Sequence, residues 1–515
     1  MNRKIQIRLL FALGALAVLF QGIPAVSAQS GGLRTYTSET TAAVQTTEVV
    51  AGSLPVMEAE SPAPPAETEP APDTDISEND TPAEPEILSF PDVNESDWFY
   101  TDVTKLASLG IINGYPDGSF LPHNQITNAE FIKILMISAG MDLEEVPEEQ
   151  LYAESWASLY ISIAYANGII TDADLDAGFS PDDFITRSAM TKMMILALGI
   201  EPSRIDDPFT DISDMYASTA YNEYLLRGYL QPDDTRIYDG GSPAARSEAA
   251  AIAVRIIEYR EDAYKYKKNA ILENASENPL NNEFELLNLF YILNREFFTE
   301  FTFETAIPAE TVSSYYTHSN LINLEYFYSS GIYATPTGNV YPLTIQYDTD
   351  IEVLKQYHAE AEEKADKVIE AIITEGMTDA DKVKAIHDYL ILNCEYDYNN
   401  YLIGTIPYES YIAYGALCGR MAVCQGYSAA FNMLCERVGI RSVAVGGYAP
   451  GSTEDHAWNM VLVDGQLYHI DVTHDDPVPD QKGKISYKYF YLTDTEMTNL
   501  GYTWDKEQSN LKYFY

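Results

Sequence analysis

Basic residues are scarce in this sequence. Its 515 residues include 31 Lys and Arg against 78 Asp and Glu, which gives a formal net charge of −47 at pH 7. Proteins that bind nucleic-acid phosphates or anionic membranes need a basic surface. The composition therefore argues against nucleic acid and anionic membranes as partners, and it favours the solvated acidic surface of an exported protein.

Cysteine and histidine are scarce too, with 4 and 7 residues. No two cysteines have the Cys-x-x-Cys spacing of a zinc site, and no pair of histidines has ligand spacing. We therefore expect no metal and no cofactor. A disulfide among Cys394, Cys418 and Cys435 stays open, because the sequence alone does not show which side chains meet.

Hydrophobic runs long enough to span a bilayer are absent. The apolar run 9–20 is much shorter than the roughly 20 residues that a spanning helix needs. Three basic residues precede this run and small residues follow it, which is the pattern of a secretory signal peptide. We predict that residues 1–28 are this peptide and that the protein is extracellular, with no membrane insertion after cleavage.

Periodic apolar positions are missing from residues 29–87, which are rich in Pro, Ala, Thr, Ser and acidic residues. A segment of this composition cannot bury enough apolar surface to offset the conformational entropy of the chain. We therefore predict a disordered, acidic, Pro-rich linker here.

The sequence after the linker repeats three times at a period of about sixty residues. Gly110, Gly168 and Gly228 recur at intervals of 58 and 60, and each is followed by a pair of apolar residues. Each unit reads as a helix, a Gly/Asp/Pro-rich loop and a second helix. In the first unit, Thr127 and Glu130 form a capping box that begins the second helix. The predicted units are residues 88–150, 151–205 and 206–262.

These units resemble S-layer homology repeats. The resemblance implies an all-α domain with pseudo-threefold symmetry, which attaches the protein to an anionic secondary polymer of the cell wall. It rests on four short motifs: Phe90-Pro91-Asp92-Val93, Gly114-Tyr115-Pro116-Asp117-Gly118, Ile185-Thr186-Arg187-Ser188 and Phe209-Thr210-Asp211-Ile212.

In that family, an Arg after the Thr of the second helix binds the polymer. Arg187 and Arg246 match this position, whereas Asn128 departs from it and Ala245 replaces the Thr of the third unit. An Arg near a helix N-terminus suits an acidic sugar, because the guanidinium and the backbone N–H groups both face the anion. The alternative is that these arginines only form surface ion pairs.

Two tryptophans recur in the repeats. Trp98 and Trp156 lie 58 residues apart, and each begins a helical run. Large aromatic residues are more often part of a core than platforms for a ligand, so we expect both indole rings to be buried.

Residues 263–339 combine a basic helical run with patches rich in Tyr and Phe. We predict a helical, aromatic connecting region whose rings pack against the next domain, with a platform for carbohydrate or peptide as the alternative. That domain is placed at residues 340–515. Alternating apolar residues predict a strand over 340–347, and helical periodicity predicts helices over 351–374 and 379–392.

A cysteine in the last domain lies where a helix is predicted to begin. Cys424 precedes an amphipathic run that Gly439 ends. A thiol at a helix N-terminus faces the positive end of the helix dipole, which favours the thiolate. We expect Gly426 and Ser428 to leave room for a substrate beside the sulfur.

A predicted hairpin brings a histidine and an aspartate together. The Asp-Gly pair at 464–465 is typical of a two-residue turn between strands. With that turn, Val463 pairs with Gln466, and His456 becomes a diagonal neighbour of Asp471 on one face of the sheet. A register shift of one residue would separate the two side chains.

These three residues predict nucleophilic catalysis. Asp471 orients His456, His456 takes the proton of Cys424, and the thiolate attacks a carbonyl carbon. The other histidines nearby are expected to be structural or to support the site: His387, His469 and His474.

The same stretch resembles the bacterial transglutaminase-like superfamily, within the papain-like fold. The resemblance covers about 340–479 and includes all three catalytic positions. It departs at His474, where relatives often have Trp, and at Cys418, which is not usually Cys. The backbone N–H of Cys424 is one candidate oxyanion donor. The motifs are Tyr414-Gly415-Ala416-Leu417, Val423-Cys424-Gln425-Gly426-Tyr427-Ser428, His456-Ala457-Trp458-Asn459 and Asp471-Val472-Thr473.

The sequence as a whole predicts a multidomain protein, with an all-α S-layer homology domain followed by an α+β papain-like, transglutaminase-like domain.

The resemblance to the transglutaminase-like superfamily implies acyl transfer through a thioester. Water as the acceptor gives a peptidase or amidase that acts on wall-associated protein or peptide, which is the leading interpretation. An amine as the acceptor gives a protein-cross-linking transglutaminase. A wall-anchored binding or scaffold protein without catalysis is the third interpretation, and the full Cys/His/Asp set argues against it.

Overall fold

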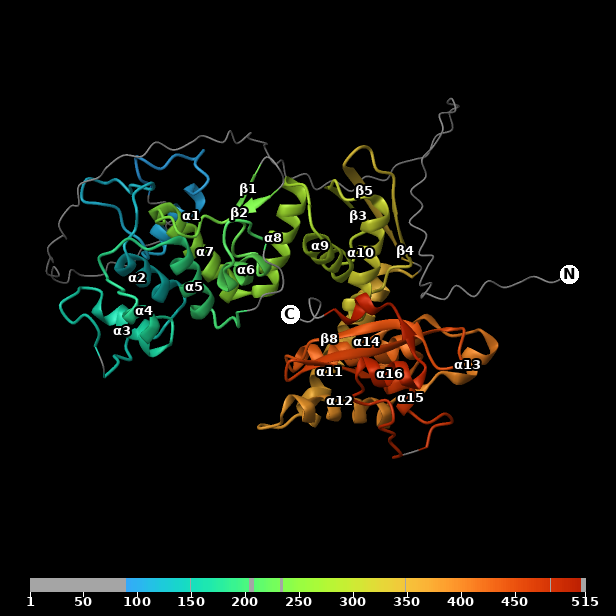
Figure 1. Cartoon of the computed structure of the whole chain (residues 1–515). Helices are drawn as coiled ribbons and strands as arrows, with labels where there is room; N and C mark the ends of the chain where they lie inside the picture. Colours follow the sequence, from blue (N-terminus) through green and yellow to red (C-terminus); the bar gives the residue numbers. More distant parts are fainter. Residues whose placement is uncertain are drawn as a thin grey trace, which may run out of the picture. The chain divides into compact units, whose positions relative to one another are not determined.

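A computed structural model gives the fold, and it describes residues 89–510 apart from 149, 203–207, 232–234, 348 and 482. The predicted signal peptide, 1–28, and the predicted linker, 29–87, lie outside the described residues. No helix among the residues that the structure describes is long and apolar enough to cross a membrane. The described chain consists of a repeat region, a connecting region and a C-terminal region (Figure 1).

The repeat region is built mainly from short helices. Its two short strands, β1 and β2, pair in antiparallel fashion, so the expectation of a purely α-helical domain is not confirmed. The elements are α1 (Tyr100–Ser108), α2 (Asn128–Ser138), α3 (Ser158–Ala166), α4 (Asp172–Asp176), α5 (Arg187–Ala197), α6 (Met215–Asn222), β1 (Tyr229–Leu230), β2 (Arg236–Ile237) and α7 (Arg246–Glu261).

A closed ring of backbone hydrogen bonds joins the three repeats. The N–H of Ile126 donates to Ala244 O (3.0 Å), that of Ala244 to Ile185 O (2.8 Å), and that of Ile185 to Ile126 O (3.0 Å). These residues occupy the same place in each repeat, just before the second helix. The ring gives the region the cyclic arrangement that a pseudo-threefold domain requires. The predicted capping box is present, since Thr127 and Glu130 exchange hydrogen bonds at the start of α2.

The expected burial of two tryptophans is wrong. The side chains of Trp98 and Trp156 are 62% and 55% exposed, whereas Phe99 and Ala157, one position later, are 2% and 0% exposed. In both repeats the residue buried just before the first helix is therefore the one that follows the tryptophan. The Trp156 ring lies 5.9 Å from the Nζ of Lys133.

The connecting region has a layer of helices and a three-stranded antiparallel sheet in the order β3-β5-β4. The predicted strand is confirmed, because alternate residues of β5 are buried. This strand pairs on both sides with strands that precede it, so the sheet crosses the predicted domain boundary at 340. The elements are α8 (Ala263–Glu277), α9 (Glu283–Arg295), β3 (Glu300–Glu304), α10 (Ala309–Ile322), η1 (Leu324–Tyr326), β4 (Gly331–Ala334) and β5 (Val340–Gln346).

The C-terminal region begins with two long helices, close to the predicted bounds. Its main sheet is antiparallel, in the order β10-β9-β8-β11. Mixed helix and sheet fit the predicted α+β class. The elements are α11 (Ile351–Ile372), α12 (Asp379–Asn393), β6 (Glu395–Tyr396), α13 (Tyr398–Ile403), η2 (Tyr408–Tyr411), η3 (Gly415–Gly419), β7 (Met421–Ala422), α14 (Cys424–Arg437), β8 (Ser442–Tyr448), β9 (Asp455–Val463), β10 (Gln466–Ile470), α15 (Val472–Asp475), α16 (Asp494–Leu500), β11 (Thr503–Trp504) and η4 (Lys506–Ser509).

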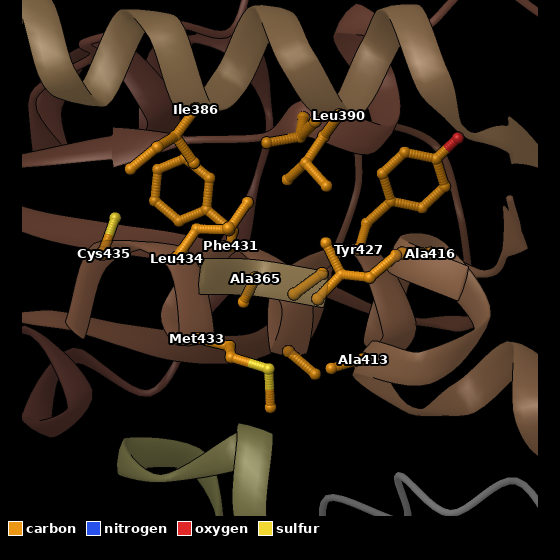
Figure 2. Close-up of a cluster of buried hydrophobic side chains, with 14 of the residues drawn as sticks. Ala365, Ile386, Leu390, Ala413, Ala416, Tyr427, Phe431, Met433, Leu434 and Cys435 are labelled. Carbon is orange, nitrogen blue, oxygen red and sulfur yellow. The ribbon is translucent and has the colours of Figure 1, made fainter. Parts of the chain in front are cut away.

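Helix α14 is the centre of this region's core. Every residue from Gln425 to Cys435 is buried, as expected of a helix enclosed on all sides. Figure 2 shows Ile386 and Leu390 of α12 facing Phe431 of α14. On its other side α14 packs against strands β8 and β9.

The connecting region packs against the same helix. Leu324 and Phe327 belong to the hydrophobic core that surrounds α14. The Asn432 amide of α14 donates to the buried Glu325 carboxyl at 3.0 Å, and the Tyr326 hydroxyl donates to Glu436 at 2.6 Å. The prediction that aromatic residues of this region pack against the next domain is therefore confirmed.

Candidate active site

Cys424 is the first residue of α14. The residue before it, Val423, has extended backbone angles and offers no side-chain cap, so the backbone N–H groups of the first turn stay free of a capping side chain. The thiol is partly exposed at the positive end of the helix. Strands β6 and β7, a short parallel pair, lead the chain to this point.

The expected role of Gly426 and Ser428 is wrong. A Cβ atom on Gly426 would lie 2.5 Å from the carbonyl oxygen of Ser410, so this glycine allows the chain near residue 410 to pack closely against α14. Ser428 is 2% exposed. The space beside both residues is therefore filled by the protein itself.

The predicted hairpin is confirmed. Val463 pairs with Gln466, and the turn residues Asp464 and Gly465 have φ angles of 50° and 73°, as a type I′ turn requires. Asp471 lies one residue beyond the end of β10, where it caps α15, rather than on the strand.

His456 and Asp471 meet as the hairpin predicts. The Nε2 atom of His456 lies 2.7 Å from Oδ2 of Asp471, which leaves Nδ1 as the ring nitrogen available to the thiol. Both residues are buried, with 8% and 0% exposure. The Trp458 ring is stacked beside the His456 ring, with 5.8 Å between their centres.

Each member of this pair stabilises the charged form of the other. Burial lowers the pKa of His456, but Asp471 and then Cys424 outweigh it and raise this pKa to about 10. Burial raises the pKa of Asp471, but His456 and His474 lower it well below its ordinary value. The buried Asp471 carboxylate therefore stabilises the protonated form of the His456 imidazole.

Two further side chains contact the Asp471 carboxylate. Tyr502 Oη lies 2.7 Å from Asp471 Oδ2, and His474 Nδ1 lies 2.9 Å from the same oxygen. The His474 ring is also stacked on His456, with 4.4 Å between the centres. Sequence reasoning gave His474 only a supporting place and missed Tyr502, which lies between α16 and β11 and carries no motif that signals its position.

His469 and His387 lie in other networks. His469 Nδ1 accepts from Trp458 Nε1 at 2.8 Å, and its Nε2 lies 2.9 Å from Asp494 Oδ1. His387 is fully buried in α12, with Nδ1 3.0 Å from Asp388 Oδ1. Both therefore act as structural residues, as expected.

The four cysteines, all in the described part of the chain, are free thiols, so the open question of a disulfide is answered for this structure. Burial raises the pKa of Cys394 to about 12 and that of Cys435 well above its ordinary value. Burial also raises the pKa of Cys418. These three thiols are thereby disfavoured as thiolates at neutral pH.

One group of side chains in the described residues has the composition of a metal site. The ligand atoms of His456, Asp471 and His474 lie within 4.8 Å of one another. However, the two imidazole–carboxylate contacts of 2.7 and 2.9 Å are hydrogen-bond distances. Ligand atoms around a tetrahedral zinc ion with bonds of about 2.0 Å lie about 3.3 Å apart. The group fits a hydrogen-bonded cluster better than a metal site.

The two predicted polymer-binding arginines each begin a helix and reach another repeat. Arg187, at the start of α5, lies 2.6 Å from Asp239 Oδ2 and 2.9 Å from Glu248 Oε1. Each of these carboxylates belongs to the third repeat. Arg187 is therefore already paired, as the ion-pair alternative requires.

Arg246 has a different environment. Its Nε donates to Phe120 O at 3.0 Å, and its guanidinium lies 4.9 Å from the ring centres of Tyr115 and Phe120. Its carboxylate partner, Glu130, is 3.4 Å away. At the matching position of the first repeat, the Asn128 amide donates to Ser180 O at 2.8 Å.

Comparison with known proteins assigns both parts of the chain. The S-layer homology domain model matches residues 89–132 and 152–191, and the transglutaminase-like superfamily model matches residues 366–472. The chain carries S-layer homology repeats and a transglutaminase-like domain. These repeats, together with relatives among surface-layer and cell-wall proteins, indicate an extracellular protein associated with the cell wall.

Individual relatives cover only parts of the chain. The Surface-layer 125 kDa protein of Lysinibacillus sphaericus is 31% identical over 106 residues, which are 19% of this chain and 9% of that protein. The Kyphoscoliosis peptidase of Homo sapiens is 27% identical over 143 residues, which are 25% of this chain and 21% of that protein. A solved structure described as "Crystal structure of a TGase" covers 34% of this chain and 50% of its own, at 17% identity and a TM-score of 0.21, too low to establish a shared fold. The chain thus spans about a fifth or less of these two curated relatives.

Proposed function

We propose that the transglutaminase-like domain is a cysteine enzyme that transfers acyl groups through a thioester on Cys424. The observation that carries this proposal is the buried His456–Asp471 pair at 2.7 Å, with the pKa of His456 raised in part by Cys424. A domain that only binds a partner has no need of a thiol, an imidazole and a carboxylate coupled in this way.

The reaction follows from the positions of these groups. His456 Nδ1 takes the proton of the thiol, and the thiolate attacks a substrate carbonyl carbon. The backbone N–H of Cys424 is a candidate donor to the oxyanion. His456 then gives its proton to the departing amine, which leaves a thioester on Cys424. Asp471 holds the imidazole in the required orientation and stays ionised throughout.

We propose water as the acceptor that resolves the thioester. His456, neutral again, takes a proton from water, and the resulting attack releases a carboxylic acid and restores the thiol. The similarity to a protein named as a peptidase supports this choice over an amine acceptor. The expected substrate is protein or peptide at the cell wall, because the S-layer homology repeats hold the enzyme there.

The repeats are proposed to bind an anionic secondary polymer of the cell wall through Arg187 and Arg246. Both side chains lie at helix N-termini, where backbone N–H groups add to the attraction of an anion. The polymer must compete with the carboxylates that already pair with each arginine.

The proposal is tested by comparing wild type with Cys424→Ala on casein and on wall protein, with and without an added amine. Release of peptides should fall at least about 10³-fold in the variant. Cys418→Ala is the matched control, because it removes another partly buried thiol of the same domain, and it should stay active. Hydrolysis that survives Cys424→Ala would overturn the catalytic assignment. Incorporation of the amine by wild type would replace water as the acceptor, and no reaction in any arm would favour a binding protein.

A further inference from the structure

Helix α13 carries an exposed apolar surface. Four of its six residues are large and aliphatic or aromatic, yet the helix has no buried residue. Tyr398, Tyr401, Leu402 and Ile403 are 44%, 38%, 61% and 73% exposed. Single exposed apolar residues are ordinary on protein surfaces, whereas a group of neighbouring ones marks a place where a ligand or partner binds.

Three of these side chains share one side of the helix. Tyr398, Tyr401 and Leu402 are spaced at i, i+3 and i+4, which places them on the same side of an α-helix. The rings of Tyr398 and Tyr401 are nearly parallel, with centres 6.3 Å apart and 23° between the planes. We call these three residues the α13 face. The face offers aromatic and aliphatic surface to a ligand and carries no charged group of its own.

The fold brings the α13 face to the proposed active site. Strand β6, just before α13, pairs in parallel with β7, which ends just before the start of α14. The Tyr401 ring centre lies 6.2 Å from that of Tyr396 in β6. The Tyr401 hydroxyl donates to the carboxylate of Glu454, which comes two residues before His456 in the chain. Tyr401 therefore joins the segment that leads to the proposed nucleophile to the segment that leads to the proposed base.

The electrostatics of three tyrosines also place them close to the Cys424 thiol. Burial, and then Cys424, raises the pKa of Tyr396 and that of Tyr411. The pKa of Tyr401 is raised to about 12, first by its hydrogen bond to Glu454, then by burial, and in part by Cys424. Coulombic interactions weaken with distance, so all three tyrosines lie near the thiol.

We propose that the α13 face is a substrate subsite that receives a bulky apolar or aromatic side chain close to the scissile bond. This inference rests on the proposed acyl transfer at Cys424, and it names the substrate class as extended polypeptide with side chains such as those of leucine, phenylalanine or tyrosine. Packing of such a side chain on the face removes apolar surface of both partners from water. Glu454, at the edge of the face, repels acidic side chains, so acidic peptides are expected to be poor substrates.

The charge of the molecule argues against two other occupants of the α13 face. An anionic membrane would be repelled by a chain with a formal net charge of −47. A second copy of this chain, with its α13 face packed on this one about a twofold axis, would bring two Glu454 carboxylates close together. A polypeptide substrate brings no such repulsion.

The first measurement maps the bonds that the wild-type full chain cleaves in unfolded casein, by mass spectrometry of the released peptides. A large apolar or aromatic residue should be enriched at one position near the cleaved bond. A synthetic peptide that spans a mapped bond is then made with leucine, alanine or glutamate at that position. We expect kcat/KM to be about tenfold or more higher for the leucine peptide than for the other two.

Leu402→Ser removes the most exposed member of the α13 face. Its kcat/KM for the leucine peptide should fall to within about twofold of that for the alanine peptide, mainly through a higher KM, because the substitution takes away binding surface and leaves the reacting groups in place. Leu402→Met keeps an apolar side chain and should keep the preference. Leu392→Ser is the matched control, because it removes an exposed leucine of α12, at 50% exposure, and it should keep the wild-type preference.

Equal rates for the three peptides, or an unchanged preference in Leu402→Ser, would overturn the inference while the proposed function stands. If Leu402→Ser instead halves the mass of the protein measured by light scattering and leaves the preference unchanged, α13 joins two copies and the inference is wrong. If wild type cleaves neither casein nor any of the peptides, the proposed function fails, and the substrate class fails with it.

Discussion

Asp471 is the residue on which the site depends most. Its carboxylate is fully buried, and Oδ2 alone contacts His456, Tyr502 and His474 at 2.7, 2.7 and 2.9 Å. A buried charge is tolerated only when donors of this kind surround it. The same donors that stabilise the carboxylate also fix its direction toward His456.

Replacing Asp471 by Asn should abolish most of the activity while the fold remains. In this structure the backbone N–H of His474 donates to Oδ1 of Asp471 at 3.1 Å. Asn keeps an oxygen that can accept this hydrogen bond, so α15 keeps its cap. The negative charge that holds the proton on His456 is lost. We expect kcat/KM to fall by about 10³- to 10⁴-fold, and the iodoacetamide labelling rate of Cys424 at pH 7 to fall with it. A variant with unchanged labelling would show that the carboxylate does not act through His456.

Tyr502→Phe should lower stability through the same carboxylate. Tyr502 is 1% exposed, and its hydroxyl has no access to water that could replace the lost donor. Hydrogen bonds to charged groups contribute about 1.5–3 kcal/mol, and we expect the free energy of unfolding to fall by that amount in urea titrations. Tyr487→Phe is the control, because this exposed tyrosine also contacts a carboxylate, Asp388, and its loss should cost about 0.5 kcal/mol or less.

At the scale of elements, the packing around α14 positions Cys424, the proposed nucleophile. The helix begins at Cys424 and is buried over the next three turns, so a shift of its first turn moves the thiol relative to His456. Gly426, two residues after the cysteine, is held against the backbone at Ser410 and the side chain of Ala422. This close approach ties the start of the helix to the preceding loop.

Gly426→Ala should therefore disturb both stability and labelling of Cys424. The new Cβ would lie 2.5 Å from Ser410 O, a backbone atom that cannot rotate away. Overpacking of this kind costs about 1–3 kcal/mol, more than the gain of roughly 1 kcal/mol from the better helix propensity of Ala. Gly419→Ala is the matched control, since its Cβ would meet nothing closer than 3.9 Å. Equal melting temperatures for the two variants would show that the loop moves aside freely.

The hairpin shows how far the sequence could predict the site. A two-residue Asp-Gly turn fixes the register of its strands, so the pairing of His456 with Asp471 follows from local chemistry alone. Tyr502 could not be predicted, because it lies 31 residues after Asp471, between α16 and β11, and its position depends on tertiary packing. Trp98 was misplaced for a similar reason, since the repeat spacing indicates where a helical run begins but not which of the residues just before it is buried.

At the scale of the whole molecule, the repeat region and the transglutaminase-like domain each have their own hydrophobic core. The ring of backbone hydrogen bonds through Ile126, Ile185 and Ala244 closes within the repeat region. Neither the proposed polymer-binding arginines nor the proposed catalytic residues depend on the other region for their contacts. Wall binding and catalysis should therefore be separable by substitution.

Changing Arg187 and Arg246 together to Ala should release the protein from purified cell walls without affecting catalysis. Both guanidinium groups lie at helix N-termini and reach another repeat, so their loss removes the two proposed anion sites. We expect the bound fraction in a pull-down to fall about tenfold or more, since hydrogen bonds to charged groups contribute about 1.5–3 kcal/mol each. Hydrolysis of soluble casein should stay within about twofold of wild type.

Lys105→Ala is the control, because this cation of the same region forms only a surface ion pair with Glu258, and it should leave wall binding intact. Unchanged binding by the double variant would mean that the arginines serve only to join the repeats through the carboxylates they already contact.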